Sequence, residues 1–131
     1  MEGRLSVVPA AVAAGQVNHL ALDVERFWFC VIMTGECAEL PENAEPWRIG
    51  EATPPETVLA SYRQEIDRAN EIIVATPVGM PPAQWPEEWA TWQLANLREV
   101  MLHVITETAC HAGHLDAARE LIDGRQWMVL G

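Results

Sequence analysis

Residues 96–124 read NLREVMLHVITETACHAGHLDAARELIDG, and this stretch decides the fold. Asn96 is a favourable N-cap residue, and Glu99 three positions later completes a capping-box pattern. Gly124 suits the left-handed conformation that closes a helix, and no proline interrupts the run between these signals. The pattern therefore predicts a helix over about 97–123, roughly 40 Å long at about 1.5 Å per residue.

Two stripes run along this predicted helix at three- and four-residue steps. The first stripe is largely apolar and contains Leu97, Met101, Val104, Thr108, Ala112, Leu115, Ala118 and Ile122. The second stripe is polar and contains His103, Glu107, His111 and His114. At about 100° per residue the polar stripe falls beside the apolar one, at the edge of the core where water is partly excluded. That placement favours a metal site.

Spacing limits which of these polar residues can share one ion. Residues four apart are about 6 Å apart along the axis and can chelate from one face, whereas residues eight apart, at about 12 Å, cannot. The pairs left open are His103 with Glu107, Glu107 with His111, and His111 with His114. Imidazole and carboxylate suit zinc, nickel or iron(II), and a catalytic zinc site takes a third protein ligand. The other histidine, His19, lies on a different segment. The alternative is a polar helix edge whose histidines pack against a neighbouring element.

Two earlier stretches also have helical patterns. The first covers about residues 10–34, with an apolar stripe of Val12, Leu20, Val24, Phe27 and Val31. His19 lies close to that stripe, and Asp23 one turn later either orients its ring or is solvated. Thr53-Pro54-Pro55-Glu56 predicts the start of a second helix over about 54–74, capped by Thr53. Three long helices predict an all-α, up-and-down helical bundle that forms one domain over residues 1–131.

Residues 77–95, PVGMPPAQWPEEWATWQLA, connect the second and third predicted helices. A structureless loop of this length is unusual in a compact domain. Pro86-Glu87-Glu88 favours a short helix through Trp92. The tryptophans of this segment either roof the metal site or cap the end of the bundle.

Composition excludes several classes of function. Half of the residues are apolar, which argues against a disordered chain, and no apolar run approaches the ~18 residues of a membrane span. We therefore expect a cytoplasmic protein without a membrane partner. With 19 acidic and 8 basic residues the net charge is -11, which repels phosphate backbones, so we expect no nucleic-acid partner. Cys30, Cys37 and Cys110 form no C-x-x-C pair, and we expect reduced thiols, with Cys110 as a small packing residue.

The segment LREVMLHVITETACHAGHLDAARELIDG, together with VNHLALDVERFWF at residues 17–29, resembles the DinB-like (DinB/YfiT-like) superfamily. The recurring features are the His-Leu pair of the earlier helix and the Glu-x-x-x-His-x-Gly-His run of the last. The nearest branches are the actinobacterial mini-circle proteins and mycothiol-dependent maleylpyruvate isomerase. Members are four-helix bundles that bind a divalent metal. Carried over by motif, the resemblance implies His19, Glu107 and His111 as metal ligands, with His103 and His114 beside them as candidate catalytic bases.

The resemblance also implies a function. It suggests a divalent metal, zinc before nickel or iron(II), and a low-molecular-weight thiol such as mycothiol. The expected activity is a thiol-dependent transfer or isomerisation of a small electrophilic substrate. The alternative is a non-catalytic, stress-associated metal-binding or interaction protein of the same fold. Relatives begin with another helix before the His-Leu helix, so this chain is expected either to form a homodimer through an exposed apolar groove or to be a shortened reading of a longer gene.

Overall fold

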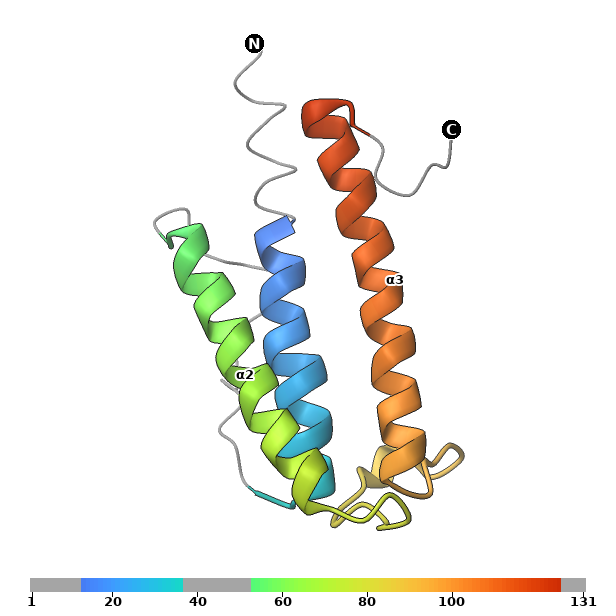
Figure 1. Cartoon of the computed structure of the whole chain (residues 1–131). Coiled ribbons are helices and arrows are strands. Elements are labelled where there is room, and N and C mark those ends of the chain that lie inside the picture. The colour runs from blue at the N-terminus through green and yellow to red at the C-terminus, as the bar shows by residue number, and fades with distance from the viewer. Residues whose placement is uncertain (1–12, 37–52, 126–131) are drawn as a thin grey trace.

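The computed structural model describes residues 13–36 and 53–125, and within them the chain is helical without strands (Figure 1). Residues 13–19 are α-helical and continue directly into η1. The elements in chain order are η1 (Leu20–Met33), α2 (Pro55–Ala75), the single-turn 3₁₀ helix η2 (Glu87–Trp89) and α3 (Leu97–Asp123). The predicted all-α bundle of three long helices is confirmed. Residues 10–12 of the first predicted helix lie outside the described residues.

The helix that carries η1 lies between α2 and α3, and it packs against both of them (Figure 1). It runs in the same direction as α2, and α3 returns in the opposite direction (Figure 1). The direction of the chain therefore does not alternate at every connection. This arrangement makes η1 the element from which the other two helices are positioned.

The hydrogen bonds of η1 are of the wide i→i+5 (π) type, which is rare over a run of 14 residues. Such winding takes about 4.4 residues per turn, so residues four and five positions apart share a face. The buried side chains on this face are Leu20, Val24, Phe29 and Met33. The sequence analysis placed Phe27 and Val31 on the apolar stripe, and both are only half-buried. Phe27 still packs against the core, as predicted, whereas Val31 is not among the core residues.

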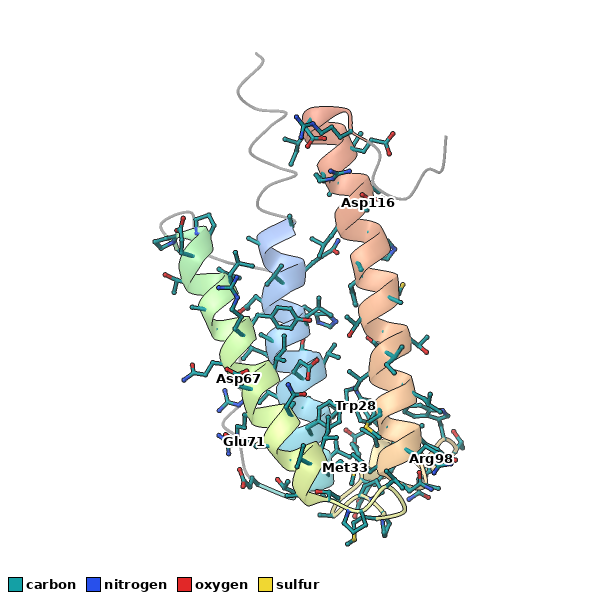
Figure 2. All side chains as sticks on the ribbon, in the orientation of Figure 1. Trp28, Met33, Asp67, Glu71, Arg98 and Asp116 are labelled. Atoms are coloured by element: carbon teal, nitrogen blue, oxygen red, sulfur yellow. The ribbon has the colours of Figure 1, made fainter. Side chains whose placement is uncertain are left out.

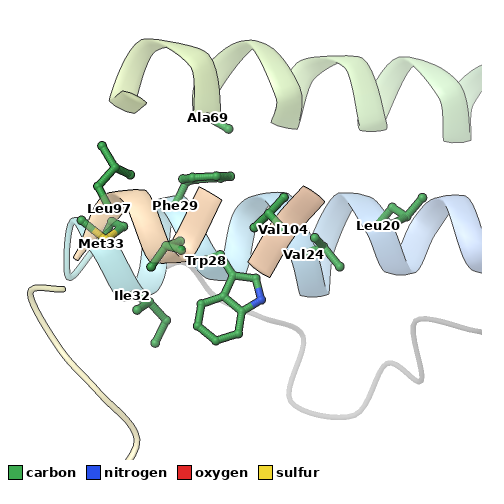
Figure 3. Close-up of a cluster of buried hydrophobic side chains, with 10 residues drawn as sticks. Leu20, Val24, Trp28, Phe29, Ile32, Met33, Ala69, Leu97 and Val104 are labelled. Carbon is green, nitrogen blue, oxygen red and sulfur yellow. The ribbon is translucent and has the colours of Figure 1, made fainter. Parts of the chain in front are cut away.

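The hydrophobic core lies along η1 (Figure 3). Its buried members are Leu20, Val24, Trp28, Phe29, Ile32, Met33, Ala69, Leu97, Val100 and Val104. Six of these ten come from η1 and only Ala69 comes from α2. All three members from α3 lie near its start, so the second half of that helix extends past the core. The candidate metal ligands on α3 therefore begin where the core ends.

The ends of α3 follow the signals in its sequence. Asn96 Oδ1 accepts a hydrogen bond from the Glu99 N–H at 3.1 Å, and Glu99 Oε2 accepts one from the Ala95 N–H at 2.6 Å. Gly124 closes the helix with a φ of 70°. The start of α2 differs from the prediction, because the N-cap is Pro54 and no side chain caps the helix. The predicted cap at Thr53 was wrong.

The segment between α2 and α3 is tied to the lower end of the bundle. The Ala83 N–H donates to Ile32 O at 3.0 Å, and the Leu97 N–H donates to Met80 O at 2.9 Å. The helix expected to extend through Trp92 is present only as the single turn η2. Among the residues that the structure describes, no helix combines the length and apolarity needed to cross a membrane.

Candidate metal centre

His19 sits where the α-helical stretch widens into η1. Its Nδ1 lies 2.9 Å from Asp23 Oδ2, one turn further on. A neutral imidazole in this pair donates its Nδ1–H to the carboxylate and keeps the lone pair of Nε2 for another partner. Of the two roles considered for Asp23, the geometry favours orientation of the His19 ring. Local widening of a helix is frequent at functional sites.

Glu107 occupies the middle of the polar stripe on α3. Its Oε2 lies 3.8 Å from His111 Nε2, and its Oε1 lies 3.5 Å from His103 Nε2. The ring of His111 meets the ring of His19 edge-on, with centroids 4.6 Å apart and an interplanar angle of 61°. The contact between these two imidazoles joins α3 to the helix that leads into η1.

Ligand atoms of His19, Glu107 and His111 lie within 4.8 Å of one another, and all three residues are half-buried. Two imidazoles and one carboxylate form a His₂Glu set that suits zinc. Zinc bonds of about 2.0–2.2 Å place tetrahedral ligand atoms about 3.4 Å apart. Side-chain movements of about 1–1.5 Å would therefore close the three around one ion. The residues present fit a divalent metal.

The electrostatic setting of His111 suits a metal ligand. Burial disfavours its charged form and lowers its pKa below the ordinary value, and the neighbouring His19 lowers the pKa further. The carboxylate of Glu107 acts in the opposite direction, and His114 adds a lowering contribution. Neutral imidazole is the form that binds metals. His111 is therefore in its metal-binding form at neutral pH.

The two other histidines of α3 lie outside this group of three. The ring of His103 packs against Trp28 and Trp92, with centroid separations of 4.7 and 5.3 Å. His103 therefore contacts Glu107 from the side of the tryptophans. His114 is exposed, and its ring centroid lies 5.9 Å from that of His111. Of the five candidate residues, His19, Glu107 and His111 converge. His103 contacts Glu107, and His114 is exposed to solvent.

Four tryptophans form one compact cluster beside His103. Trp28 comes from η1 and lies between η1 and α3 near the lower end of the bundle (Figure 2). It meets Trp85, Trp89 and Trp92, and all six centroid separations among the four indoles are between 5.5 and 6.1 Å. This tryptophan cluster closes the end of the bundle and also borders the candidate metal centre through His103.

Sequence reasoning missed the place of Trp28 beside the candidate site. Its side chain is indeed buried, but it also contacts His103. With about 4.4 residues per turn, Trp28 falls on the same face of its helix as His19. A helical period of 3.6 hides that relationship, so no signal in the sequence pattern revealed it.

Neither of the two described cysteines, Cys30 and Cys110, belongs to the group of three. Cys110 was expected to be a packing residue, but it is exposed, so that prediction was wrong. Cys30 is buried, and its thiol donates to Glu36 Oε2 at 3.2 Å. Burial and this hydrogen bond raise the pKa of the Cys30 thiol. Cys37 lies outside the described residues.

Comparison with known families gives one result. A family model described as mycothiol-S-transferase matches residues 3–124. The match covers His19 as well as the complete polar stripe of α3. No curated protein and no solved structure matches the chain.

Proposed function

The chain belongs to the mycothiol-S-transferase family, and from this premise we propose that it is a metal-dependent enzyme. The enzyme would transfer a thiol to a small electrophilic substrate, or would use the thiol to isomerise that substrate. Membership confirms the DinB-like superfamily expected from the sequence. The observation that carries the proposal is the convergence of His19, Glu107 and His111 from two separate helices. Mycothiol is the proposed thiol because the family is described by it.

The proposed metal ligands are His19 through Nε2, one carboxylate oxygen of Glu107, and one ring nitrogen of His111. This donor set favours zinc, with nickel or iron(II) as alternatives. When bound, the ion would supply positive charge that lowers the pKa of a thiol or water at its open position. The side chain of Glu107 is 36% exposed, which leaves the centre accessible from solvent.

Residues around the centre have separate proposed roles. Asp23 holds the His19 ring so that Nε2 faces the centre. His114 is exposed close to His111 and is the proposed base that accepts the thiol proton. His103 is the second candidate base, but its packing between two tryptophans suits it better to hold Glu107 in position.

The proposal includes a cytoplasmic location, no membrane partner and no nucleic-acid partner, the last supported by the net charge of -11. It also includes a homodimer. A large apolar side chain of α3, Ile105, is 62% exposed, and a second copy would cover such a group. Sedimentation velocity over a range of protein concentrations tests this assembly.

The second candidate function is a non-catalytic, stress-associated metal-binding or interaction protein. The open setting of the centre favours it, because α3 extends past the core and Glu107 remains partly exposed. The two functions share the metal and differ in turnover.

Metal analysis combined with a thiol-consumption assay separates these possibilities. The transferase predicts about one divalent ion per chain and consumption of mycothiol with an electrophile, and both are lost in His111→Ala. The matched control is Cys110→Ala, which changes the exposed neighbour of His111. Stoichiometric metal without turnover supports the second candidate. A protein purified and reconstituted without stoichiometric metal contradicts both.

A further inference from the structure

A shallow groove borders the candidate metal centre on one side of α3. It has a volume of about 320 Å³ and is lined by Trp92, Leu94, Glu99, Leu102, His103 and Thr106. This size lies at the lower end of the range for small-molecule sites, about 300–1,000 Å³. None of the three proposed metal ligands lines it.

We propose that this groove binds the uncharged, apolar part of the electrophilic substrate, and that an aromatic ring fits it best. The inference rests on the proposed function and adds the substrate class. His103 provides the connection, because its ring lines the groove and its Nε2 lies 3.5 Å from Glu107 Oε1. The imidazole of His103 therefore lies between an aromatic ring held in the groove and the carboxylate of Glu107.

The walls of the groove offer exposed apolar surface in a fixed position. Trp92 is 45% exposed and Leu102 is 58% exposed, so both have apolar area available to a ligand. Trp92 is held in place, because Trp85 Nε1–H donates to its carbonyl oxygen at 3.1 Å and its ring packs against Trp28 and Trp85. A preformed indole wall favours aromatic ligands, which stack against it edge-on or offset.

The charge around the groove selects against anions. Glu99 is the one acidic side chain among the lining residues, and the lining contains no arginine or lysine. Glu99 is also fixed, through its hydrogen bond with the Ala95 N–H. A carboxylate on the substrate would meet this side chain as well as the overall charge of -11, with no arginine or lysine in the groove to offset them. The groove therefore fits a neutral electrophile better than a carboxylic acid.

Binding of an unreactive probe tests the groove without the proposed chemistry. The probe is 1,3-dinitrobenzene, which is neutral and lacks a leaving group, and its anionic counterpart is 3,5-dinitrobenzoate. Titration calorimetry on the full chain as purified, with no thiol present, measures both affinities. We expect dinitrobenzene to bind at least about tenfold more tightly than dinitrobenzoate.

The test variant is Leu102→Glu, which adds a charge to the groove, and the matched control is Leu121→Glu. Both leucines are exposed on α3, so neither change disturbs the core. Leu102→Glu is expected to weaken dinitrobenzene binding at least about tenfold, while Leu121→Glu leaves it unchanged. Circular dichroism verifies that both variants fold.

Three outcomes overturn the inference. If dinitrobenzene binds the wild type and both variants with equal affinity, the probe binds elsewhere. If the wild type binds dinitrobenzene and dinitrobenzoate with equal affinity, the proposed substrate class is wrong. If the wild type does not bind the probe, and sedimentation shows a dimer that only Leu102→Glu disrupts, the groove is the contact surface for a second copy of the chain. Probe binding that follows expectation while no turnover is found overturns only the proposed function.

Discussion

His19 Nδ1 lies 2.9 Å from Asp23 Oδ2, so a carboxylate one turn along the same helix fixes the orientation of a proposed metal ligand. Replacing such a partner typically costs a metal site about 10- to 100-fold in affinity. Asp23→Asn is therefore expected to lower zinc affinity by that factor, measured by competition with a fluorescent chelator. Asp67→Asn on α2 is the control (Figure 2). An unchanged affinity in Asp23→Asn would show that Asp23 is only a solvated neighbour.

Metal binding should also stabilise the folded chain. An ion that binds only the folded state at about 100 times its Kd stabilises it by about 2.7 kcal/mol. Thermal unfolding with zinc and with excess chelator measures the difference as a rise in Tm. His111→Ala should remove the rise, because it deletes one of the three converging ligands. A rise of the same size in His111→Ala would place the zinc elsewhere on the chain.

Glu25 gives a prediction on pH and stability. Burial, and then the carboxylate of Glu65, raise the pKa of Glu25 to about 7 in the folded chain. The folded state therefore holds more protons than the unfolded state between about pH 4.5 and 7, and stability falls as pH rises through that range. Glu25→Gln removes this loss, so the free energy of unfolding of the variant, relative to that of the wild type, should rise by about 1–2 kcal/mol between pH 4 and 8, since partial solvent exposure screens part of the effect.

Urea unfolding at several pH values measures that trend. Glu65→Gln should give part of the same gain, because it removes the like charge but leaves Glu25 buried. Glu87→Gln, in the segment between α2 and α3, is the control and should follow the wild type. A constant difference between Glu25→Gln and the wild type at all pH values would contradict the raised pKa.

His114 is the proposed base, and its removal should affect turnover more than metal binding. A positioned general base contributes about 10²- to 10⁴-fold to a rate. His114→Ala is expected to lower kcat/KM for mycothiol transfer by about 10²-fold while retaining one metal per chain. Added imidazole should restore part of the rate, since the position is exposed. If His103→Phe loses activity instead and His114→Ala keeps it, the roles of the two residues are reversed.

Features of α3 could be predicted because the sequence signals for them lie within the helix itself. The cap at Asn96, the closing Gly124 and the four-residue spacing of Glu107 and His111 all lie within α3 and depend on its own geometry. Pairing of these residues with His19 depends on contacts between distant segments. Spacing left the partners of Glu107 and His111 open, with His19 as the remaining histidine, and the family resemblance assigned His19 to the same ion.

Other features depend on tertiary packing and left no local pattern. The wide winding of η1 buries Met33 more completely than Val31, and no residue type signals such winding in advance. The tryptophan cluster is arranged by contacts between segments, such as the hydrogen bond from Trp85 to the carbonyl of Trp92. Sequence spacing cannot give that arrangement.

The winding of η1 has a consequence for anyone who transplants this centre into a designed scaffold. Trp28 follows His19 by nine positions, and the two share a face only at about 4.4 residues per turn. An ordinary α-helix would rotate the indole by roughly 160°, away from its imidazole neighbour on the facing helix. A scaffold with regular α-helices would need the tryptophan about seven positions after the histidine, close to two full α-helical turns.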